Sequence, residues 1–288
     1  MLAVKLMTGG KSRLCPRFQA KTRNAPRARD SVRYNLGRIF SLSGGGSGHH
    51  LISVNKTLSP LCCYWETEAL NHKGFMNAIA CKAVLFDLDG TLVDSGACIE
   101  TLWAEWATRH HLDVDYVLAN IHGRTIEETL RLVSPYFDNP QCVDEVKTLA
   151  IEALSQVGAI TGAVELVRQL PPQCWAIVTS GAKKVSMQSM ISAGIPHPHM
   201  MITSEDIVYG KPHPEPYLMA AAGFGLPVQK CVIFEDAISG VNSAIAAGGQ
   251  VIVIGDGVPI SSPQIKATVA DLSSFKAEFI DGIIHLSW

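Results

Sequence analysis

The chain has 288 residues, of which 47% are hydrophobic and 17% are charged, so it can bury a large core in one or two domains. The formal net charge of −2 excludes a strong whole-chain attraction to nucleic acid or to anionic membranes, and we expect neither as a partner. No apolar run approaches the ~20 residues that a membrane-spanning helix needs, and no secretory signal pattern is present.

The first part of the chain differs in charge from the rest. Residues 1–75 carry twelve lysines and arginines against three acidic residues, a formal charge of +9, whereas the remainder carries −11. Three interpretations of this basic leader stay open: residues that precede a true start at Met76, a cleaved targeting peptide over Met1 to Ser43, or a nucleic-acid-binding arm with few aromatic residues. In each case we expect the leader to be disordered.

After the leader, short apolar runs alternate with helical patterns. The expected strands are 82–87, 175–179, 200–203, 231–235, 251–254 and, more weakly, 268–270. The expected connecting helices are 182–193, 215–223 and 239–247. Strands separated by helices predict an α/β fold with a Rossmann-like parallel sheet covered by helices on both faces.

Residues 95–162 interrupt this alternation with helical periodicity. We therefore expect an inserted helical cap domain there, while 76–94 and 163–288 form the α/β core. Trp103 and Trp106 suit the interior of the cap. An amphipathic helix is expected to begin near Thr125, because Glu128 follows at capping-box spacing. The tail at 279–286 is expected to form a last helix or loop, and no function is assigned to it.

Two aspartates follow the apolar run Ala83–Phe86. Asp87 and Asp89 are two residues apart, so both carboxylates lie on one side where a buried strand ends. Gly90 allows the backbone to turn sharply, and Thr91 can tie that turn with its hydroxyl. Ligands gather at the carboxyl ends of strands in open α/β sheets, although two solvated aspartates in a turn would have the same spacing.

Three more polar stretches follow predicted strands. They are Thr179-Ser180-Gly181, Tyr209-Gly210-Lys211-Pro212 and Glu235-Asp236. Taken singly, the first could be an ordinary turn and the second a solvated lysine, but adjacent acids at a strand end need a cation to offset their repulsion. Together with 87–91, the four stretches resemble the haloacid dehalogenase-like (HAD) superfamily over about Lys82 to Ala270, and 87–95 is similar to its phosphatase and phosphomutase branch.

The resemblance implies phosphoryl transfer, and the residues present suit it. Hydrolysis through a covalent aspartyl-phosphate needs a carboxylate nucleophile and a second group that protonates the departing oxygen and later activates water. We nominate Asp87 as the nucleophile and Asp89 as the acid and base. Thr179 would hold phosphoryl oxygens, and Lys211 would neutralise phosphate and nucleophile, so both are also predicted to be catalytic.

A hard cation with oxygen ligands would offset the repulsion among these anions, and Mg²⁺ is the expected cofactor. The expected ligands are the carboxylates of Asp87 and Asp236 and the main-chain carbonyl of Asp89. Glu235 is expected next to them and is counted among the metal-site residues.

The expected substrate is a small phosphorylated metabolite. His122 and Arg124 flank Gly123 in the predicted cap, and such a His-Gly-basic turn is similar to one in sugar-phosphate and polyol-phosphate phosphatases of the family, although ordinary exposed residues before a helix are an equal alternative. The predicted substrate-binding residues are Asp87, Leu88, Asp89, Thr179, Ser180, Gly181, Lys211, His122 and Arg124.

We therefore predict a Mg²⁺-dependent phosphatase that acts on a small sugar phosphate or polyol phosphate. Asp89 argues against a dehalogenase, which needs no second aspartate as an acid, and the late position of Lys147 in the cap argues against a phosphonatase. A β-phosphoglucomutase-like mutase is the alternative, although that group carries a histidine where this chain has residues 97–100, Ala-Cys-Ile-Glu.

An alternative of another class is a catalytically silent protein that binds a phosphorylated metabolite. Such a protein should have lost a nucleophile or a metal ligand. Asp87, Asp89, Lys211 and Asp236 are all present, so an enzyme is favoured. The sequence makes no prediction of the oligomeric state.

Eight cysteines are scattered along the chain without a Cys-x-x-Cys pair. Several lie in apolar runs, where cysteine packs as a small buried hydrophobic side chain. This use of cysteine indicates a reducing compartment. We expect a soluble cytoplasmic protein, or an organellar one if the leader is a transit peptide.

Overall fold

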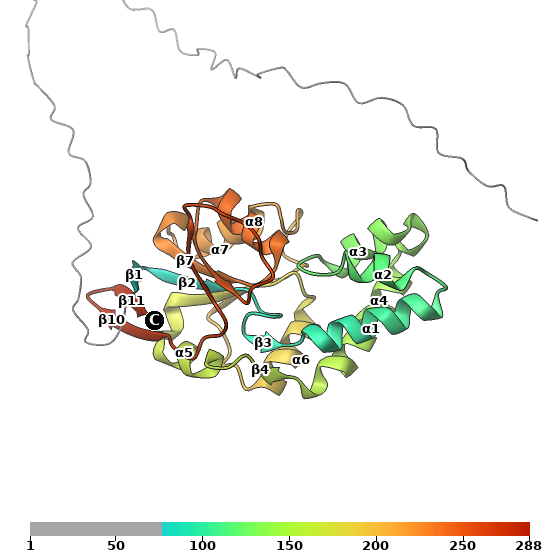
Figure 1. The fold of residues 1–288 in the computed structure, drawn as a ribbon, viewed down its shortest axis with the longest axis horizontal. Coiled ribbons are helices and arrows are strands. Elements are labelled where there is room, and N and C mark those ends of the chain that lie inside the picture. Colours follow the sequence, from blue (N-terminus) through green and yellow to red (C-terminus); the bar gives the residue numbers. More distant parts are fainter. Residues whose placement is uncertain (1–76) are drawn as a thin grey trace, which may run out of the picture. The chain divides into compact units, whose positions relative to one another are not determined.

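A parallel sheet lies at the centre of the computed structural model, which describes residues 77–288; the predicted leader lies outside them. The sheet has six strands in the order β6-β5-β2-β7-β8-β9 (Figure 1). They are β2 (Ala83–Phe86), β5 (Trp175–Val178), β6 (Met200–Ile202), β7 (Cys231–Glu235), β8 (Gln250–Ile254) and β9 (Ile265–Val269). The predicted α/β class with a Rossmann-like parallel sheet is confirmed, although the last strand begins and ends before the predicted 268–270.

Helices cover both faces of this sheet. Alternate strand residues such as Phe86 and Ile177 pack toward α5 (Ala163–Gln169) and α6 (Lys183–Ala193). Their neighbours, such as Leu85, pack toward α7 (Glu215–Gly223) and α8 (Ile238–Ala247). Strands buried on both faces read as continuous apolar runs, which is why they could be found in the sequence. The three predicted connecting helices are confirmed with ends that differ by at most one residue.

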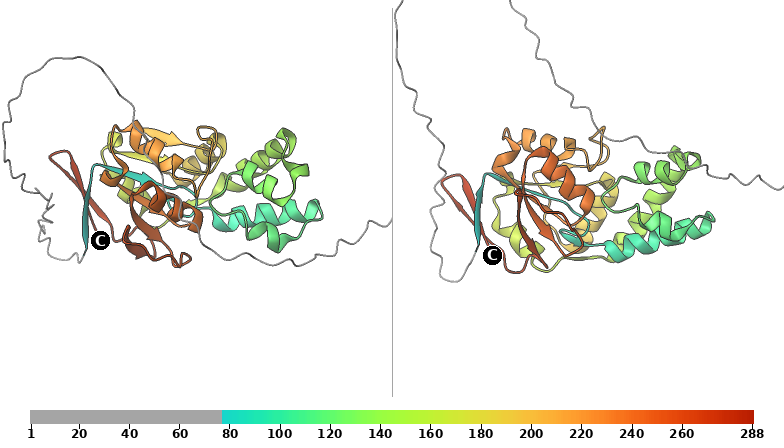
Figure 2. Two further views of the ribbon diagram at one scale, coloured as in Figure 1. Left: turned by 90° about the horizontal axis from the view of Figure 1, so that it is seen from above. Right: turned by 45° about the horizontal axis from the view of Figure 1, so that its top comes forward.

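Four helices form a separate group between the two short paired strands β3 (Val93–Asp94) and β4 (Gly158–Ala159) (Figures 1 and 2). This group, called the cap below, consists of α1 (Gly96–Arg109), α2 (Val114–Leu118), α3 (Ile126–Val133) and α4 (Pro140–Ala153). Trp106 is fully buried at its centre, and its ring meets the ring of Trp103 edge-on. The predicted capping box at the start of α3 is present.

A second sheet corrects the prediction for the tail. Residues 279–286 are neither helix nor loop: β10 (Lys276–Ile280) and β11 (Ile283–Ser287) form an antiparallel hairpin, and β11 also pairs with β1 (Ala78–Cys81). Asp281 and Gly282, both with positive φ, make the two-residue turn, as Asp-Gly pairs do in hairpins. Ile284 and Leu286 then alternate into the core.

The strand order fixes where a ligand can bind. From β2 the chain runs to β5 and β6 on one side and then crosses to β7, β8 and β9 on the other. Connections that diverge in this way leave a crevice at the carboxyl end of the central strand. Of residues 77–288, no helix is both long enough and apolar enough to span a bilayer.

Candidate active site

Four loops at the carboxyl ends of neighbouring strands bring the predicted catalytic residues together. Asp87 directly follows β2, and Thr179 directly follows β5. Lys211 lies in the loop after β6, and Asp236 directly follows β7. Because these strands are neighbours in the sheet, residues up to 149 positions apart in the chain converge on one crevice.

Lys211 is a buried cation bonded to two of the carboxylates near this crevice. Its side chain is 1% exposed, and its Nζ donates to Asp87 Oδ1 at 2.5 Å, to Glu235 Oε1 at 2.6 Å and to the Val178 carbonyl at 2.9 Å. Burial alone would lower the pKa of Lys211, but the carboxylates of Asp87 and Glu235 outweigh this effect and raise the pKa above its ordinary value. The ammonium therefore stays charged and holds Asp87 in place.

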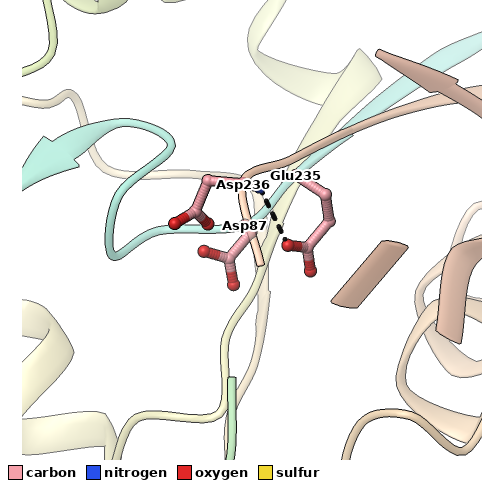
Figure 3. A group of neighbouring side chains, drawn as sticks. All are labelled: Asp87, Glu235 and Asp236. Atoms are coloured by element: carbon pink, nitrogen blue, oxygen red, sulfur yellow. Dashed lines mark hydrogen bonds between the residues drawn. The ribbon is translucent and has the colours of Figure 1, made fainter. Parts of the chain in front are cut away.

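Glu235 is turned toward protein groups. Its Oε1 accepts hydrogen bonds from Lys211 and, at 2.5 Å, from the hydroxyl of Tyr217 in α7. Its Oε2 accepts from the backbone N–H of Asp236 at 3.1 Å, the bond drawn in Figure 3, and of Ala237 at 3.4 Å. Both carboxylate oxygens of Glu235 are thus satisfied within the protein.

Tyr217 is a site residue that the sequence reasoning did not find. Its side chain is fully buried, and burial beside the Glu235 carboxylate raises the pKa of its hydroxyl well above the ordinary value, so it remains a donor. A tyrosine in an otherwise alanine-rich helix was the available signal, because a buried tyrosine hydroxyl normally needs a partner.

Asp89 lies beside the Thr179 loop. The Ser95 hydroxyl donates to Asp89 Oδ1 at 2.8 Å, and Asp89 Oδ2 lies 3.6 Å from the position that a Cβ on Gly181 would occupy. Burial raises the pKa of Asp89, with Ser95 acting in the opposite direction. Thr179 Oγ1 accepts from the Gly181 N–H at 2.9 Å and keeps its own proton to donate. The first two predicted stretches therefore face the same space.

Asp236 stands against the first loop. Thr91 Oγ1 donates to its Oδ1 at 3.2 Å, and a Cβ on Gly90 would lie 2.6 Å from its carboxyl carbon. Gly90 also has a φ of +87°, so both space and backbone require glycine. Burial and the Glu235 carboxylate raise the pKa of Asp236 to about 7, as is expected for a buried carboxyl group beside a second anion.

The donor set fits a divalent cation. Oxygens of Asp87, Glu235 and Asp236 lie within 4.8 Å of one another, with Asp87 between the other two in Figure 3. Lys211 neutralises only part of this negative charge. Carboxylate oxygens are the ligands that Mg²⁺ takes, usually one or two together with waters and substrate oxygens. The carboxylates of Asp87 and Asp236 could therefore hold Mg²⁺.

A cavity of about 170 Å³ opens above these groups between the core and the cap. Asp87, Asp89, Thr179 and Asp236 form its polar wall. The cap contributes apolar side chains from α1 and α4 and the turn at residues 121–125, called the cap turn below.

The remaining predicted substrate-binding residues are placed as follows. Ser180, Gly181, His122 and Arg124 line the cavity. The Leu88 side chain is instead fully buried in the hydrophobic core, which leaves only its main chain near the site.

Comparison with known proteins supports this description. Residues 84–254 match the family described as haloacid dehalogenase-like hydrolase. The chain is 41% identical over 191 residues to hexitol phosphatase A of Escherichia coli, which covers 65% of this chain and 88% of that protein. It is 31% identical over 215 residues to glycerol-1-phosphate phosphohydrolase 2 of Saccharomyces cerevisiae, and this match covers 70% of this chain and 81% of that protein. The fold is similar to that of a β-phosphoglucomutase from Clostridium difficile, with a TM-score of 0.60 at 18% identity over 68% of this chain and 93% of that one.

Replacing the Tyr217 hydroxyl tests the buried network. We expect Tyr217→Phe to lower the free energy of unfolding by about 1.5–3 kcal/mol, because a hydrogen bond to a buried carboxylate is lost. Urea unfolding followed by circular dichroism measures this change. Tyr209→Phe is the matched control, since that side chain is 59% exposed and should change stability by less than about 0.5 kcal/mol. Equal effects of the two variants would contradict the network.

The raised pKa of Asp236 predicts a pH dependence of stability without metal. Between its ordinary pKa of 3.8 and about 7, the folded protein holds a proton that the unfolded chain releases, so stability falls as pH rises through this range. In EDTA, urea unfolding should show that the free energy of unfolding of the wild type falls by at least about 1 kcal/mol more than that of Asp236→Asn between about pH 5 and about pH 8. If the difference in free energy of unfolding between the two proteins did not vary with pH, the predicted role of Asp236 would be contradicted.

Proposed function

Because the chain belongs to the haloacid dehalogenase-like hydrolases, we propose that it is a Mg²⁺-dependent phosphatase that hydrolyses a small sugar phosphate or polyol phosphate through an aspartyl-phosphate. The names of its relatives support this substrate class, since one is a hexitol phosphatase and another a glycerol-1-phosphate phosphohydrolase. The observation that carries the proposal is the buried Asp87 carboxylate, held by Lys211 at the wall of the cavity.

In the first step, an Asp87 carboxylate oxygen attacks phosphorus and the bond from phosphorus to the alcohol oxygen breaks. Asp89 supplies the proton to the departing alkoxide, and it stands two residues away on the same side of the chain. Lys211 fixes Oδ1 of Asp87. Thr179 has its hydroxyl proton free to bond a phosphoryl oxygen as charge redistributes.

In the second step, water attacks phosphorus and the bond from phosphorus to the Asp87 oxygen breaks. Asp89, now ionised, takes the proton of the attacking water, so inorganic phosphate leaves and both aspartates return to their starting states. The Ser95 hydroxyl bonded to Asp89 Oδ1 orients this carboxyl group through both steps.

Mg²⁺, when bound, would offset the charge that the carboxylates and the phosphoryl group bring together. We assign its side-chain ligands as Asp87 and Asp236, with the main-chain carbonyl of Asp89. Glu235 is in reach of the same space, but its oxygens already accept four hydrogen bonds from protein groups. In this proposal Glu235 orients Lys211 and lies next to the metal ligands.

The cap turn is the proposed contact for the sugar or polyol part of the substrate. Arg124 and His122 line the cavity, and both side chains are exposed enough to meet a ligand. His122 Nε2 also lies 3.1 Å from Glu100 Oε1. A guanidinium and an imidazole can both bond hydroxyl groups of a polyol, while the phosphoryl group lies against the core.

A phosphate-release assay tests the proposal. The substrates are hexitol 6-phosphates, glycerol 1-phosphate and 2-deoxyglucose 6-phosphate, each with Mg²⁺ and with EDTA. We expect release from at least one of them with Mg²⁺ only, and a loss of about 10³-fold or more in kcat for Asp87→Asn, because the nucleophile is gone. Asp144→Asn, an exposed aspartate on α4, is the matched control and should retain activity. A folded wild type with no Mg²⁺-dependent release would refute the proposed function.

A further inference from the structure

The cap turn is bonded to two separate loops of the core. Ser180, which follows Thr179, donates its hydroxyl to the Gly123 carbonyl at 2.8 Å. Ser239, at the start of α8 beyond Asp236, donates its hydroxyl to the neighbouring His122 carbonyl at 3.3 Å. Two core serines from either side of β2 therefore hold two consecutive carbonyls of the cap.

A third core loop touches the same part of the cap. The Glu128 carboxylate, which closes the capping box of α3, lies against the loop of Lys211: a Cβ on Gly210 would be 2.6 Å and 2.7 Å from its two oxygens. The loops after β5, β6 and β7 thus all converge on residues 122–128. These are also the loops that supply Thr179, Lys211 and Asp236.

Gly123 permits this close approach. Its φ is +72°, a conformation that favours glycine. A Cβ at this position would lie 3.4 Å from the Cβ of Ala237 and would overlap the Ser239 hydroxyl. The backbone of the cap turn therefore lies directly against the short side chains of Ala237 and Ser239, at the start of α8.

The Ser180 hydroxyl is hydrogen-bonded to the cap turn. The side chain is buried, and its hydroxyl proton is committed to the Gly123 carbonyl. If Ser180 binds substrate as predicted, its backbone is the part left to do so, while its hydroxyl acts on the cap.

Arg124 is the residue whose position depends on this contact. It follows Gly123 directly and lines the cavity. Within residues 77–288 the structure records no ion pair for its guanidinium, although the cavity wall is acidic. The hydrogen bond from Ser180 to the Gly123 carbonyl fixes the backbone next to Arg124. It therefore limits the positions that the Arg124 guanidinium can reach.

We infer that the hydroxyls of Ser180 and Ser239 are a latch that fixes the cap turn on the core, and that these serines are positioning residues for Arg124. The latch itself does not depend on the proposed function; only the claim that Arg124 contacts the substrate rests on it. When the latch is made, Arg124 meets the polyol part of a substrate whose phosphoryl group is at Asp87. When it is broken, the cap turn separates from both loops and the contact with the polyol is lost.

Hydrogen exchange tests the latch without any substrate. In Ser180→Ala and Ser239→Ala, we expect the amides of residues 121–125 to exchange about threefold to tenfold faster than in the wild type, because each change removes one hydrogen bond to the turn. Ser192→Ala is the matched control: its hydroxyl also donates to a carbonyl, that of Val157 at 3.0 Å, and lies outside the cavity. Unchanged exchange in both latch variants would refute the latch, whether or not the chain is a phosphatase.

Kinetics test the link to Arg124, using the hexitol phosphate that the wild type hydrolyses best. We expect Ser239→Ala to raise KM about threefold to tenfold with kcat within about twofold, and Ser180→Ala to lower kcat/KM by a similar factor. In an Arg124→Ala background, either serine change should alter kcat/KM by less than about twofold, because the residue they position is absent. Equal losses in both backgrounds would overturn the positioning role. A wild type inactive on every phosphate would instead refute the proposed function and leave the exchange result to decide the latch.

Discussion

The site depends on one buried interaction, the ammonium of Lys211 between the carboxylates of Asp87 and Glu235. Removing the cation would leave two buried carboxylates without compensation, which is among the most destabilising changes that a protein interior can undergo. The Val178 carbonyl and the Tyr217 hydroxyl complete the network, so the ends of β2, β5 and β7 and the face of α7 are all tied to it. The same interaction that holds the core loops together holds Asp87, the proposed nucleophile, in place.

The sheet order explains why these groups meet. Because β2 is central and the chain leaves it in both directions, the loops after β2, β5 and β7 open into one crevice, and the loop after β6 reaches it from beyond β5. Glycine allows the loops to approach: Gly90 lies against Asp236, and Gly123 lets the cap turn rest on the core. Cap and core thus share the cavity, which suits an enzyme that must exclude water from one half of its substrate and contact the other.

Local signals in the sequence account for what could be predicted. Buried strands read as apolar runs, and the capping box of Thr125 and Glu128 is a spacing of three residues. The acidic, hydroxyl and lysine residues of the site could be nominated because they follow those strands. The partners of Glu235 and Ser180 could not, because Tyr217 lies 18 positions from Glu235 and Gly123 lies 57 positions from Ser180, and no periodicity links them. The terminal hairpin was missed although Asp281-Gly282 signalled its turn, because the alternation of Ile284 and Leu286 is short.

The central claim is that Asp87 becomes phosphorylated during turnover, and trapping the intermediate tests it most directly. A hexitol phosphate or acetyl phosphate is mixed with the protein and Mg²⁺, the reaction is quenched in acid within milliseconds, and peptides are mapped by mass spectrometry. We expect a phosphoryl group on the peptide that contains Asp87, with fragmentation assigning it to that side chain. Phosphate found on Asp89, Asp236 or any other residue would contradict the account.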